Sequence, residues 1–412
     1  MKHTGEEISA STVSRALKPA PLPRATLAGA KKIDRVLRDN AVAHDRQQAL
    51  TDEVVDALHE GGFFGIWVPE SMRGAEMKPV ESIEIIEQLS SSDASSGWVM
   101  FAAALAIGTG AAYLGDDAVA EIYGRDRFPV IAGQGIPNGR AEPTEGGYLL
   151  SGAWSYGSGI RHVDYVHTGG IIFENGGPKL DSHGDIQARI FVVPREKFIY
   201  GDNWDVIGLR GTGSIDYSMK PTFVPTAFTH STHTKTTDRG GPLYSIGIIG
   251  FASLGHAAFA LGVGRRMLDE VALVAQTKAS PMGALKDSEA FHLDYARAEA
   301  KARAARALVF DVWGDIERTI ERGDPTTIRQ LTMARLALNH ATWSIQEVCA
   351  FGYRVGGGIA LRYGPIQRLF RDMNAATQHA TSSIPILRDC GRELAGLAEG
   401  KEWGFIGLVD KH

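Results

Sequence analysis

The chain has little cysteine and no block of charge of one sign. Among its 412 residues only two are cysteine, Cys349 and Cys390, and they are not spaced as a CxxC pair. This usage argues against a disulfide framework or a zinc site and fits a reducing cytoplasm. The formal net charge is −5, and charges of both signs are interspersed. We therefore expect neither nucleic acid nor a membrane surface as a partner.

Long apolar runs and nucleotide-binding motifs are also missing. No unbroken run of about 18 purely apolar residues occurs, so we expect no membrane-spanning helix. The first 25 residues are polar, contain proline and lack the apolar centre of a signal peptide, so we expect residues 1–25 to form a flexible arm. Neither Gly-x-Gly-x-x-Gly nor a Walker A motif occurs, which excludes the usual site for a nicotinamide dinucleotide.

The rest of the sequence changes its pattern twice. A helical pattern holds from about residue 27 to residue 123, with Pro79 at the first position of one helix. Between residues 128 and 228 the pattern changes to short β-branched and aromatic runs separated by glycine. After residue 246 the helical spacing returns, and apolar residues from 291 to 316 recur every three or four positions.

The segment Trp204–Tyr217, with the sequence WDVIGLRGTGSIDY, is the most informative of the chain. Its glycines permit positive φ and close backbone approach, while Thr212 and Ser214 bring hydroxyls into the bend before a strand. Such a loop suits a planar or phosphorylated ligand. The segment resembles the signature of the acyl-CoA dehydrogenase fold, a flavoprotein architecture in which this loop and strand belong to the flavin-binding β-domain.

The order of the domains is that of the same fold. We predict an α+β protein with an N-terminal helical domain at 26–127, a middle β-domain at 128–243 and a C-terminal helical bundle at 244–412. The resemblance implies that the middle domain is a β-barrel and that the C-terminal domain is a four-helix bundle.

The bundle continues the resemblance but lacks the catalytic base of a dehydrogenase. Gly356-Gly-Gly358 and Arg368-Leu-Phe-Arg371-Asp372 look like the family's glycine and Arg-Asp elements. The family's glutamate stands nine residues after the arginine, a position that Ala380 holds here. The nearest titratable group is His379, which can act as an acid or base near neutral pH and can hydrogen-bond an oxygen. The family's Thr-Glu-Pro-x-x-Gly-Ser-Asp flavin loop is also absent.

The middle domain instead carries Gly146-Gly-Tyr148, Ser151-Gly-Ala-Trp154 and Ser158-Gly159. This pattern is similar to that of the oxygenase components of two-component flavin-dependent monooxygenases, such as 4-hydroxyphenylacetate hydroxylase and the bacterial steroid-ring phenol hydroxylase. The resemblance implies that reduced flavin and O2 form a C4a-hydroperoxyflavin that hydroxylates an aromatic or phenolic small molecule. It also implies catalytic roles for Ser158, near flavin N5, and for His379, near the ring and the substrate.

Further residues are candidates for the site because aromatic rings can wall a planar flavin and polar groups can hold its edges. The candidate flavin-binding residues are Gln134, Trp154, Tyr156, Ser158, Trp204, Arg210, Thr212, Ser214, Lys278 and Arg371. The candidate substrate-binding residues are Trp98, Arg161, His162 and His379. His230 and His233 are three positions apart, but no third ligand is near in the sequence, so we expect no metal site.

The resemblance also implies partners. Because no nicotinamide motif occurs, the reduced flavin would come from a separate NAD(P)H:flavin reductase. Lys278 stands where the family has an FAD-binding arginine contributed by a neighbouring subunit. Lysine lacks the bidentate fork of arginine, which favours FMN, with FAD as the alternative. Sites shared between chains imply a homotetramer.

Three other functions stay open from the sequence. A dehydrogenase or oxidase that acts on an acyl-CoA would need an Asp or Glu that faces flavin N5 from another position. A member of the same branch could oxygenate nitrogen or sulfur instead of carbon. A catalytically silent homologue that only binds flavin or acts as a scaffold would lack the hydrogen bonds of Ser158 and His379.

Overall fold

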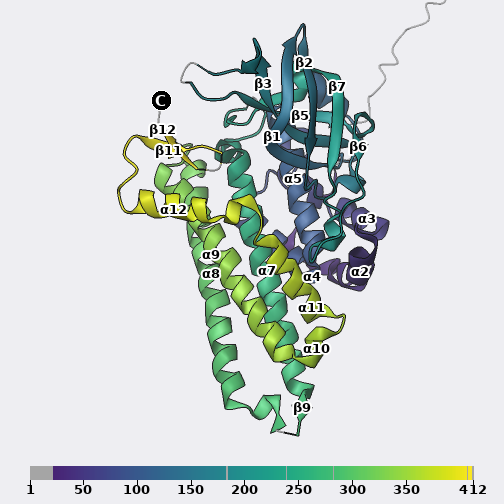
Figure 1. Cartoon of the computed structure of the whole chain (residues 1–412), viewed down its shortest axis with the longest axis vertical. Coiled ribbons are helices and arrows are strands. Elements are labelled where there is room, and N and C mark those ends of the chain that lie inside the picture. The colour runs from purple at the N-terminus through teal and green to yellow at the C-terminus, as the bar shows by residue number, and fades with distance from the viewer. Residues whose placement is uncertain (1–21, 182–183, 238, 282, 406, 411–412) are drawn as a thin grey trace, which may run out of the picture.

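The computed structural model describes residues 22–181, 184–237, 239–281, 283–405 and 407–410 (Figure 1). Figure 1 shows the β-sheet at the top, the first helices beside and beneath it, and a long helical bundle that extends to the opposite end. Helices, strands and helices follow one another in the predicted order. The α+β fold with a C-terminal bundle is therefore confirmed.

The start of the described chain is packed rather than free. Residues 1–21 of the predicted arm lie outside the described residues. Ala25 is 1% exposed, and the guanidinium of Arg24 donates to the carbonyl of Ala75 at 3.2 Å. Ala25 and Arg24 are thus in contact with the folded chain, while the flexibility of the arm stays a prediction.

The N-terminal part is built around one buried helix. Its helices are α1 (Leu27–Lys32), α2 (Asp34–Gln47), α3 (Asp52–Glu60), α4 (Pro79–Ser92), α5 (Ala94–Tyr113) and α6 (Asp116–Tyr123). The carboxylate of Asp93 caps α5 by accepting from the amide of Ser96 at 2.9 Å. Helix α5 has no charged residue and is buried on almost every side, in contact with α4, with β1 and with α7 of the bundle. It therefore connects all three parts of the fold.

Two helices of the fold are long and apolar although no unbroken apolar run of 18 residues occurs in the sequence. Ala94–Tyr113 and Pro242–Thr277 are long and apolar enough to cross a membrane by length and composition. In each, 89% of the most apolar window is buried inside the fold, as in core helices. The search for unbroken apolar runs missed them because serine, threonine and histidine interrupt the runs.

The middle part is one mixed sheet. Its strands are β1 (Ile131–Thr144), β2 (Gly147–Trp154), β3 (Tyr165–Glu174), β4 (Gly177–Pro178), β5 (Ala188–Pro194), β6 (Ile199–Tyr200), β7 (Tyr217–Pro225) and β8 (Thr229–Ser231). The order is β6-β7-β2-β1-β3-β5-β8, with β4 paired to β3. Only β1 and β3 run parallel, and their register shifts between Gln134 and Gly139. In the described chain β6 and β8 end this path without pairing to each other, so the predicted β-domain is a mixed sheet that strand pairing does not close.

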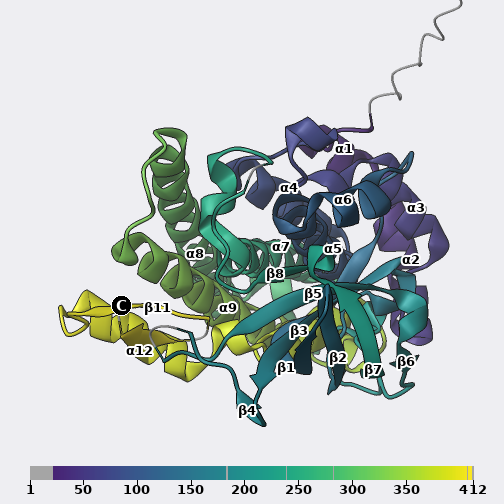
Figure 2. The same ribbon diagram turned by 90° about the horizontal axis from the view of Figure 1, so that it is seen from above.

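The C-terminal part is the helical bundle that continues below the sheet (Figures 1 and 2). Its helices are α7 (Gly247–Thr277), α8 (Glu289–Glu321), α9 (Ile328–Gly356), α10 (Gly358–Leu361), α11 (Pro365–Ala376) and α12 (Ile384–Leu394). The predicted stripe of α8 is buried at Ala298, Ala305, Val309, Val312 and Ile316. Two small hairpins, β9–β10 (Ala279–Ser280 with Gly283–Ala284) and β11–β12 (Lys401–Trp403 with Leu408–Asp410), complete the described chain.

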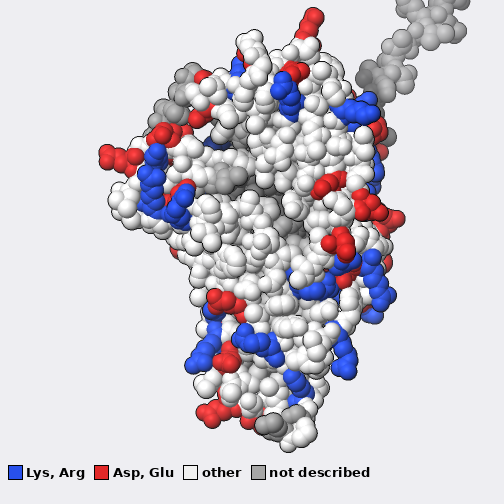
Figure 3. Space-filling view, viewed as in Figure 1, with Lys and Arg blue, Asp and Glu red and all other residues white. Residues whose placement is uncertain are grey.

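The charged side chains are mixed over the surface. On the face shown in Figure 3, lysine and arginine lie among aspartate and glutamate along the bundle, and neither sign forms a continuous field there. This face therefore offers no surface of the kind that nucleic acid or an anionic membrane attracts.

Candidate active site

The glycine-rich loop and the Arg-Asp element of the bundle, which are far apart in the sequence, meet in the structure. Gly208 lies so close to α11 that a Cβ atom there would stand 2.1 Å from the carbonyl oxygen of Arg371. The next residue, Leu209, has a φ of +53°, and its amide donates to Asp372 Oδ1 at 2.6 Å. The loop is therefore fixed on the bundle by a close backbone approach and by a buried carboxylate.

The carbonyl oxygen of Leu209 organises the interior of this loop. It accepts hydrogen bonds from Trp204 Nε1 at 3.2 Å and from Thr212 Oγ1 at 2.7 Å. Thr212 belongs to the short helix η5 (Arg210–Thr212), and Leu209 is the N-cap of that helix. The bend thus directs the hydroxyl of Thr212 inward, toward the strand that follows.

A line of hydrogen-bonded side chains leads from this bend to helix α5. Thr212 Oγ1 lies 2.7 Å from Ser214 Oγ, and Ser214 Oγ lies 2.8 Å from Ser158 Oγ. Ser158 Oγ in turn accepts from Trp98 Nε1 at 3.0 Å. The predicted catalytic serine is therefore joined to Trp98, a predicted substrate residue, and to two of the predicted flavin residues. We call these four side chains, Trp98, Ser158, Ser214 and Thr212, the Ser158 line.

His379 lies on the bundle side of Trp98. Its ring centroid is 5.8 Å from that of Trp98, and the rings meet edge to face. His379 precedes the short helix η9 (Ala380–Ser382), and its Nδ1 accepts from the amide of Thr381 at 3.4 Å. Because Nδ1 is an acceptor, the neutral ring carries its hydrogen on Nε2. Burial lowers the pKa of His379 to about 4, so the ring is neutral at pH 7.

A second histidine, His256 of helix α7, was missed in the sequence analysis. Its ring centroid lies 4.0 Å from that of His379, with 30° between the planes. Its Nδ1 donates to the carbonyl of Ala252 at 2.7 Å, so the neutral ring presents a lone pair at Nε2. Burial, and then the neighbouring His379, lower the pKa of His256 well below its usual value. The available signal was one imidazole inside an uncharged apolar stretch.

The histidine pair lies among aromatic rings. Trp98 packs edge to face on His256 at 4.8 Å and on Phe259 at 4.9 Å, and Phe101 packs on His256 at 4.8 Å between centroids. In the described chain, no hydrogen bond or ring contact of these five side chains involves a carboxylate. The group can therefore donate and accept hydrogen bonds in apolar surroundings, but it has no ionised base.

Tyr156 and Trp204 form an accessible aromatic corner near Ser158. Tyr156 has a φ of +65° and is 66% exposed, although exposed tyrosines rarely adopt that backbone region. Its ring meets that of Trp204 edge to face at 6.3 Å. Gln134 lies at the register shift of β1, where its backbone amide donates to the hydroxyl of Tyr217 at 2.8 Å.

Trp154 does not belong to this corner. It is 1% exposed, its Nε1 donates to the carbonyl of Gly169 at 2.8 Å, and its ring stacks on Tyr217 at 5.5 Å. The ring is thus a core side chain of the β-sheet with no face left for a ligand. The prediction that it walls the flavin is wrong.

Arg210 and Arg371 are held by structural contacts. Arg371 forms an ion pair with Asp45 of α2 at 3.0 Å and donates to the carbonyl of Ile207 at 2.8 Å. Arg210 donates to the carbonyls of Asp45 and Val206, at 3.2 and 2.8 Å. Both guanidinium groups therefore fasten the loop to α2, and their predicted part in flavin binding stays a prediction.

Three other predicted residues also lie outside the cluster. Arg161 forms an ion pair with Asp202 at 2.9 Å. Burial lowers the pKa of His162, and among the charged groups around that ring Asp52 of α3 has the largest effect on this pKa. Neither of these two predicted residues contacts Trp98 or His379 in the described chain. Lys278 caps the C-terminus of α7 directly before β9, which Figure 1 shows at the far end of the bundle, and its ammonium donates to the carbonyl of Val355 at 2.5 Å.

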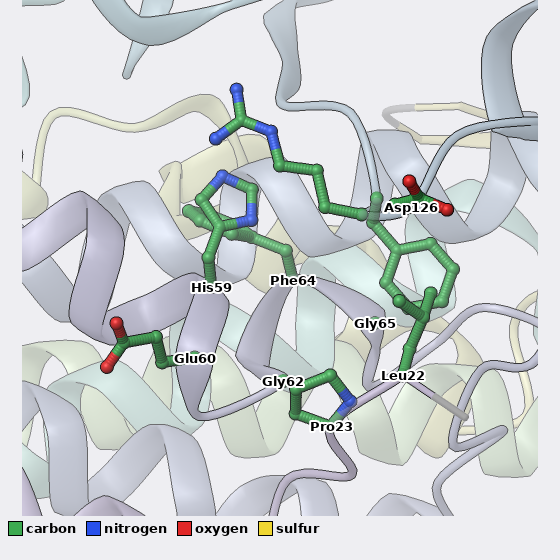
Figure 4. Close-up of a pocket in the computed structure, with 10 residues that line it drawn as sticks. Leu22, Pro23, His59, Glu60, Gly62, Phe64, Gly65 and Asp126 are labelled. Atoms are coloured by element: carbon green, nitrogen blue, oxygen red, sulfur yellow. The ribbon is translucent and has the colours of Figure 1, made fainter. Parts of the chain in front are cut away.

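A separate cavity of about 220 Å³ lies at the start of the described chain (Figure 4). It is lined by Leu22, Pro23, His59, Phe64 and Phe128, among other residues, and by none of the Ser158 line. The ring of His59 lies 4.7 Å from that of Phe64 at an angle of 58°, and burial lowers the pKa of His59 to about 4. Within the described residues, no group of three side chains could hold a metal ion.

The arrangement agrees with comparisons to known proteins. Residues 29–125 match the family described as acyl-CoA dehydrogenase, N-terminal domain, and residues 254–383 match that described as acyl-CoA dehydrogenase, C-terminal domain. The indole-3-acetate monooxygenase of Pseudomonas putida is 32% identical over 351 residues, which cover 82% of this chain and 85% of that protein.

Two solved structures are also similar. The crystal structure of the HsaA monooxygenase from Mycobacterium tuberculosis has a TM-score of 0.82 at 25% identity and covers 90% of this chain and 97% of that chain. XiaF from Streptomyces, solved in complex with FADH2 and glycerol, has a TM-score of 0.81 at 23% identity, with 90% and 95% covered. The chain therefore belongs to the acyl-CoA dehydrogenase family, in the branch of flavin-dependent monooxygenases.

Proposed function

We propose that the protein is the oxygenase component of a two-component flavin-dependent monooxygenase that hydroxylates a small aromatic or phenolic molecule with reduced flavin and O2. The observation that carries the proposal is the Ser158 line, which lies beside two neutral histidines and makes no hydrogen bond to a carboxylate of the described residues. An acyl-CoA dehydrogenase would need such a carboxylate as its base.

The residues present fit a flavin. Ser158 is only partly buried, and the exposed Tyr156 ring and the partly buried Trp204 ring stand beside it as two aromatic faces. An exposed tyrosine at positive φ is costly for a protein alone, which supports a ligand against that ring. When bound, reduced flavin supplies the two electrons with which one atom of O2 enters the substrate and the other leaves as water.

We infer that Ser158 holds the N5 edge of the flavin and that Trp98 closes that edge from the side of α5. Trp98 is 7% exposed and packs on Phe259 and His256, so it presents a rigid apolar surface to the reacting edge. Exclusion of water from this edge would protect the activated oxygen from release as peroxide.

The two histidines would hold the substrate and oxygen. His379 offers a hydrogen at Nε2, while His256 offers a lone pair at Nε2. A hydroxyl group both donates and accepts, so a phenolic substrate satisfies both rings at once. Because both rings are neutral at pH 7, neither one repels a cationic or neutral aromatic ring.

The proposal includes partners and a location. A separate NAD(P)H:flavin reductase would supply the reduced flavin, and a homotetramer would place Lys278 of one chain near the flavin phosphate of another. Exposed apolar side chains on α10 and α12, including Leu361 and Ile384, support assembly. Both cysteines are free and buried, in keeping with a cytoplasmic location.

The test is an anaerobic titration with reduced and oxidised FMN and FAD, followed by mixing with O2 and a panel of phenols and indoles. We expect tighter binding of a reduced flavin, a transient absorbance after O2 is added, and one hydroxylated product per reduced flavin. If an acyl-CoA instead bleaches bound oxidised flavin without O2, the chain is a dehydrogenase. If no flavin binds, the protein is a silent homologue, and if the product is an N-oxide or sulfoxide, the substrate class is wrong.

A further inference from the structure

We propose that Ser214 and Thr212 are positioning residues that fix Ser158 as a hydrogen-bond acceptor only, and that this polarity makes the site select reduced flavin over oxidised flavin. The inference rests on the proposed function, because it requires flavin N5 to lie against Ser158. It concerns two buried residues that do not themselves reach the flavin.

The direction of the hydrogen bonds follows from the two ends of the line. A carbonyl oxygen can only accept, so the hydroxyl hydrogen of Thr212 is donated to the carbonyl of Leu209 at 2.7 Å. With that hydrogen committed, Thr212 Oγ1 must accept from Ser214 at 2.7 Å. The hydroxyl hydrogen of Ser214 is then used in this bond and is not available to Ser158.

The same step repeats at Ser158. Because Ser214 has no hydrogen left, the contact of 2.8 Å between the serines requires Ser158 to donate. At the other end, an indole nitrogen can only donate, so Trp98 Nε1 occupies one lone pair of Ser158 at 3.0 Å. Ser158 is left with one open lone pair and no free hydrogen.

Burial keeps this direction fixed. Thr212 is 2% exposed and Ser214 is 3% exposed, so water cannot supply either hydroxyl with another partner. The Leu209 carbonyl is held in turn, because the amide of Leu209 is bound to Asp372 at 2.6 Å. A reversal of the whole line would leave that carbonyl without the Thr212 hydrogen, and a reversal of only one hydroxyl would leave two neighbouring oxygens with two hydrogens or none between them.

The open lone pair distinguishes the two redox states of a flavin. Reduced flavin carries a hydrogen on N5 and can donate it to Ser158, whereas N5 of oxidised flavin is itself an acceptor with a lone pair. Oxidised flavin would therefore set two lone pairs against each other. Because oxidised flavin cannot form this hydrogen bond to Ser158, we expect it to bind about three- to tenfold more weakly than reduced flavin.

The test measures dissociation constants for oxidised and reduced flavin, the latter without O2, in four variants. We expect Ser214→Ala to lower the ratio of the oxidised to the reduced constant by about three- to tenfold, because the freed hydrogen of Ser158 can then turn to N5. Thr212→Val should shift the ratio in the same direction, and Thr212→Ser, which keeps the hydroxyl, should leave it unchanged. Ser151→Ala on β2 is the control for loss of a serine hydroxyl elsewhere in the middle part of the chain.

A redox titration gives a readout that a merely structural role would not move. A tenfold fall in the ratio lowers the two-electron potential of the bound flavin by about 30 mV. Ser158→Ala should remove the preference, and adding Ser214→Ala to it should change the ratio no further, since Ser214 acts only through Ser158.

The inference is overturned if flavin binds and Ser214→Ala leaves the ratio where Ser151→Ala does, or if Thr212→Ser shifts it as far as Thr212→Val. It is also overturned if the two serine changes act additively. If a Ser214 variant does not fold, the Thr212 pair decides alone. Failure of the wild-type protein to bind any flavin would instead refute the proposed function.

Discussion

At the scale of single residues, backbone partners give the two adjacent histidines opposite hydrogen-bonding roles. His379 is an acceptor at Nδ1 because Thr381 donates to it, whereas His256 is a donor at Nδ1 because it faces the carbonyl of Ala252. The remaining ring nitrogen, Nε2, is therefore a donor in His379 and an acceptor in His256. Substitution of each histidine should therefore change a different property of the protein.

We predict that His379→Ala lowers the yield of hydroxylated product per reduced flavin by about 10- to 100-fold, since a hydrogen bond to developing charge is worth roughly 1.5–3 kcal/mol. The lost product should appear as peroxide, and flavin affinity should change little. His340→Ala, on the exposed side of α9, is the matched control. A product yield equal to that of the control would mean that His379 only fills the core.

His256→Phe should act on substrate recognition. Phenylalanine fills similar space but offers no lone pair, so an aromatic ligand with a hydroxyl should bind about three- to tenfold more weakly, as expected for one neutral hydrogen bond. The same ring without its hydroxyl should bind as it does to the wild type. Calorimetric titration with both ligands measures the difference, and equal losses for the two would argue for a packing role.

At the scale of elements, the site depends on the docking of the 204–214 loop on helix α11. Gly208 permits that contact, because a Cβ atom would lie 2.1 Å from the carbonyl oxygen of Arg371. Gly208→Ala should therefore destabilise the protein by about 1–3 kcal/mol and weaken flavin binding. In Gly391→Ala, where nothing lies within 4 Å of the new Cβ, stability should rise by about 0.5–1 kcal/mol. Denaturant unfolding compares the two, and equal stabilities would show that the contact is not needed.

Asp372 makes this docking sensitive to pH. Burial, together with the nearby Asp93, raises its pKa to about 7, whereas an aspartate in the unfolded chain titrates near 4. Between these values the folded protein binds a proton that the unfolded chain does not, so this group makes stability fall as pH rises from about 4 to about 7. Asp372→Asn keeps an acceptor for the Leu209 amide but cannot titrate. Unfolding measured across that range should lose this slope, and an unchanged slope would refute the assignment.

At the scale of the whole molecule, the apolar side chains left exposed on the bundle predict assembly. Ile384 is 76% exposed and Leu361 is 72% exposed, while Leu387 and Leu397 of the same region are also exposed. We expect a tetramer in sedimentation experiments, and the pair Ile384→Glu and Leu387→Glu should lower the oligomeric state without unfolding the chain. A stable monomer of the wild type with full flavin affinity would contradict this expectation.

Much of the site could be predicted from sequence where the signal was local. Ser158 and His379 were selected from short segments of sequence, and the structure brings both next to Trp98, while their catalytic roles stay predictions. Trp154, Arg210 and Arg371 stand in equally suggestive motifs, yet Trp154 is buried in the sheet and both arginines are bound to Asp45 or its backbone. Local sequence indicates which side chains are suited to a ligand, but it does not show which of them the fold has already occupied.

The sequence alone indicated the order of helices and strands through its periodicity, and its resemblance to known motifs indicated the family branch and the missing dehydrogenase glutamate at Ala380. Only the tertiary structure decided the direction of the hydrogen bonds from Thr212 to Ser158 and the stacking of His256 on His379. Those features join atoms from α5, α7, the loop and the end of α11. No local pattern records such contacts, since they arise from packing between distant segments of the chain.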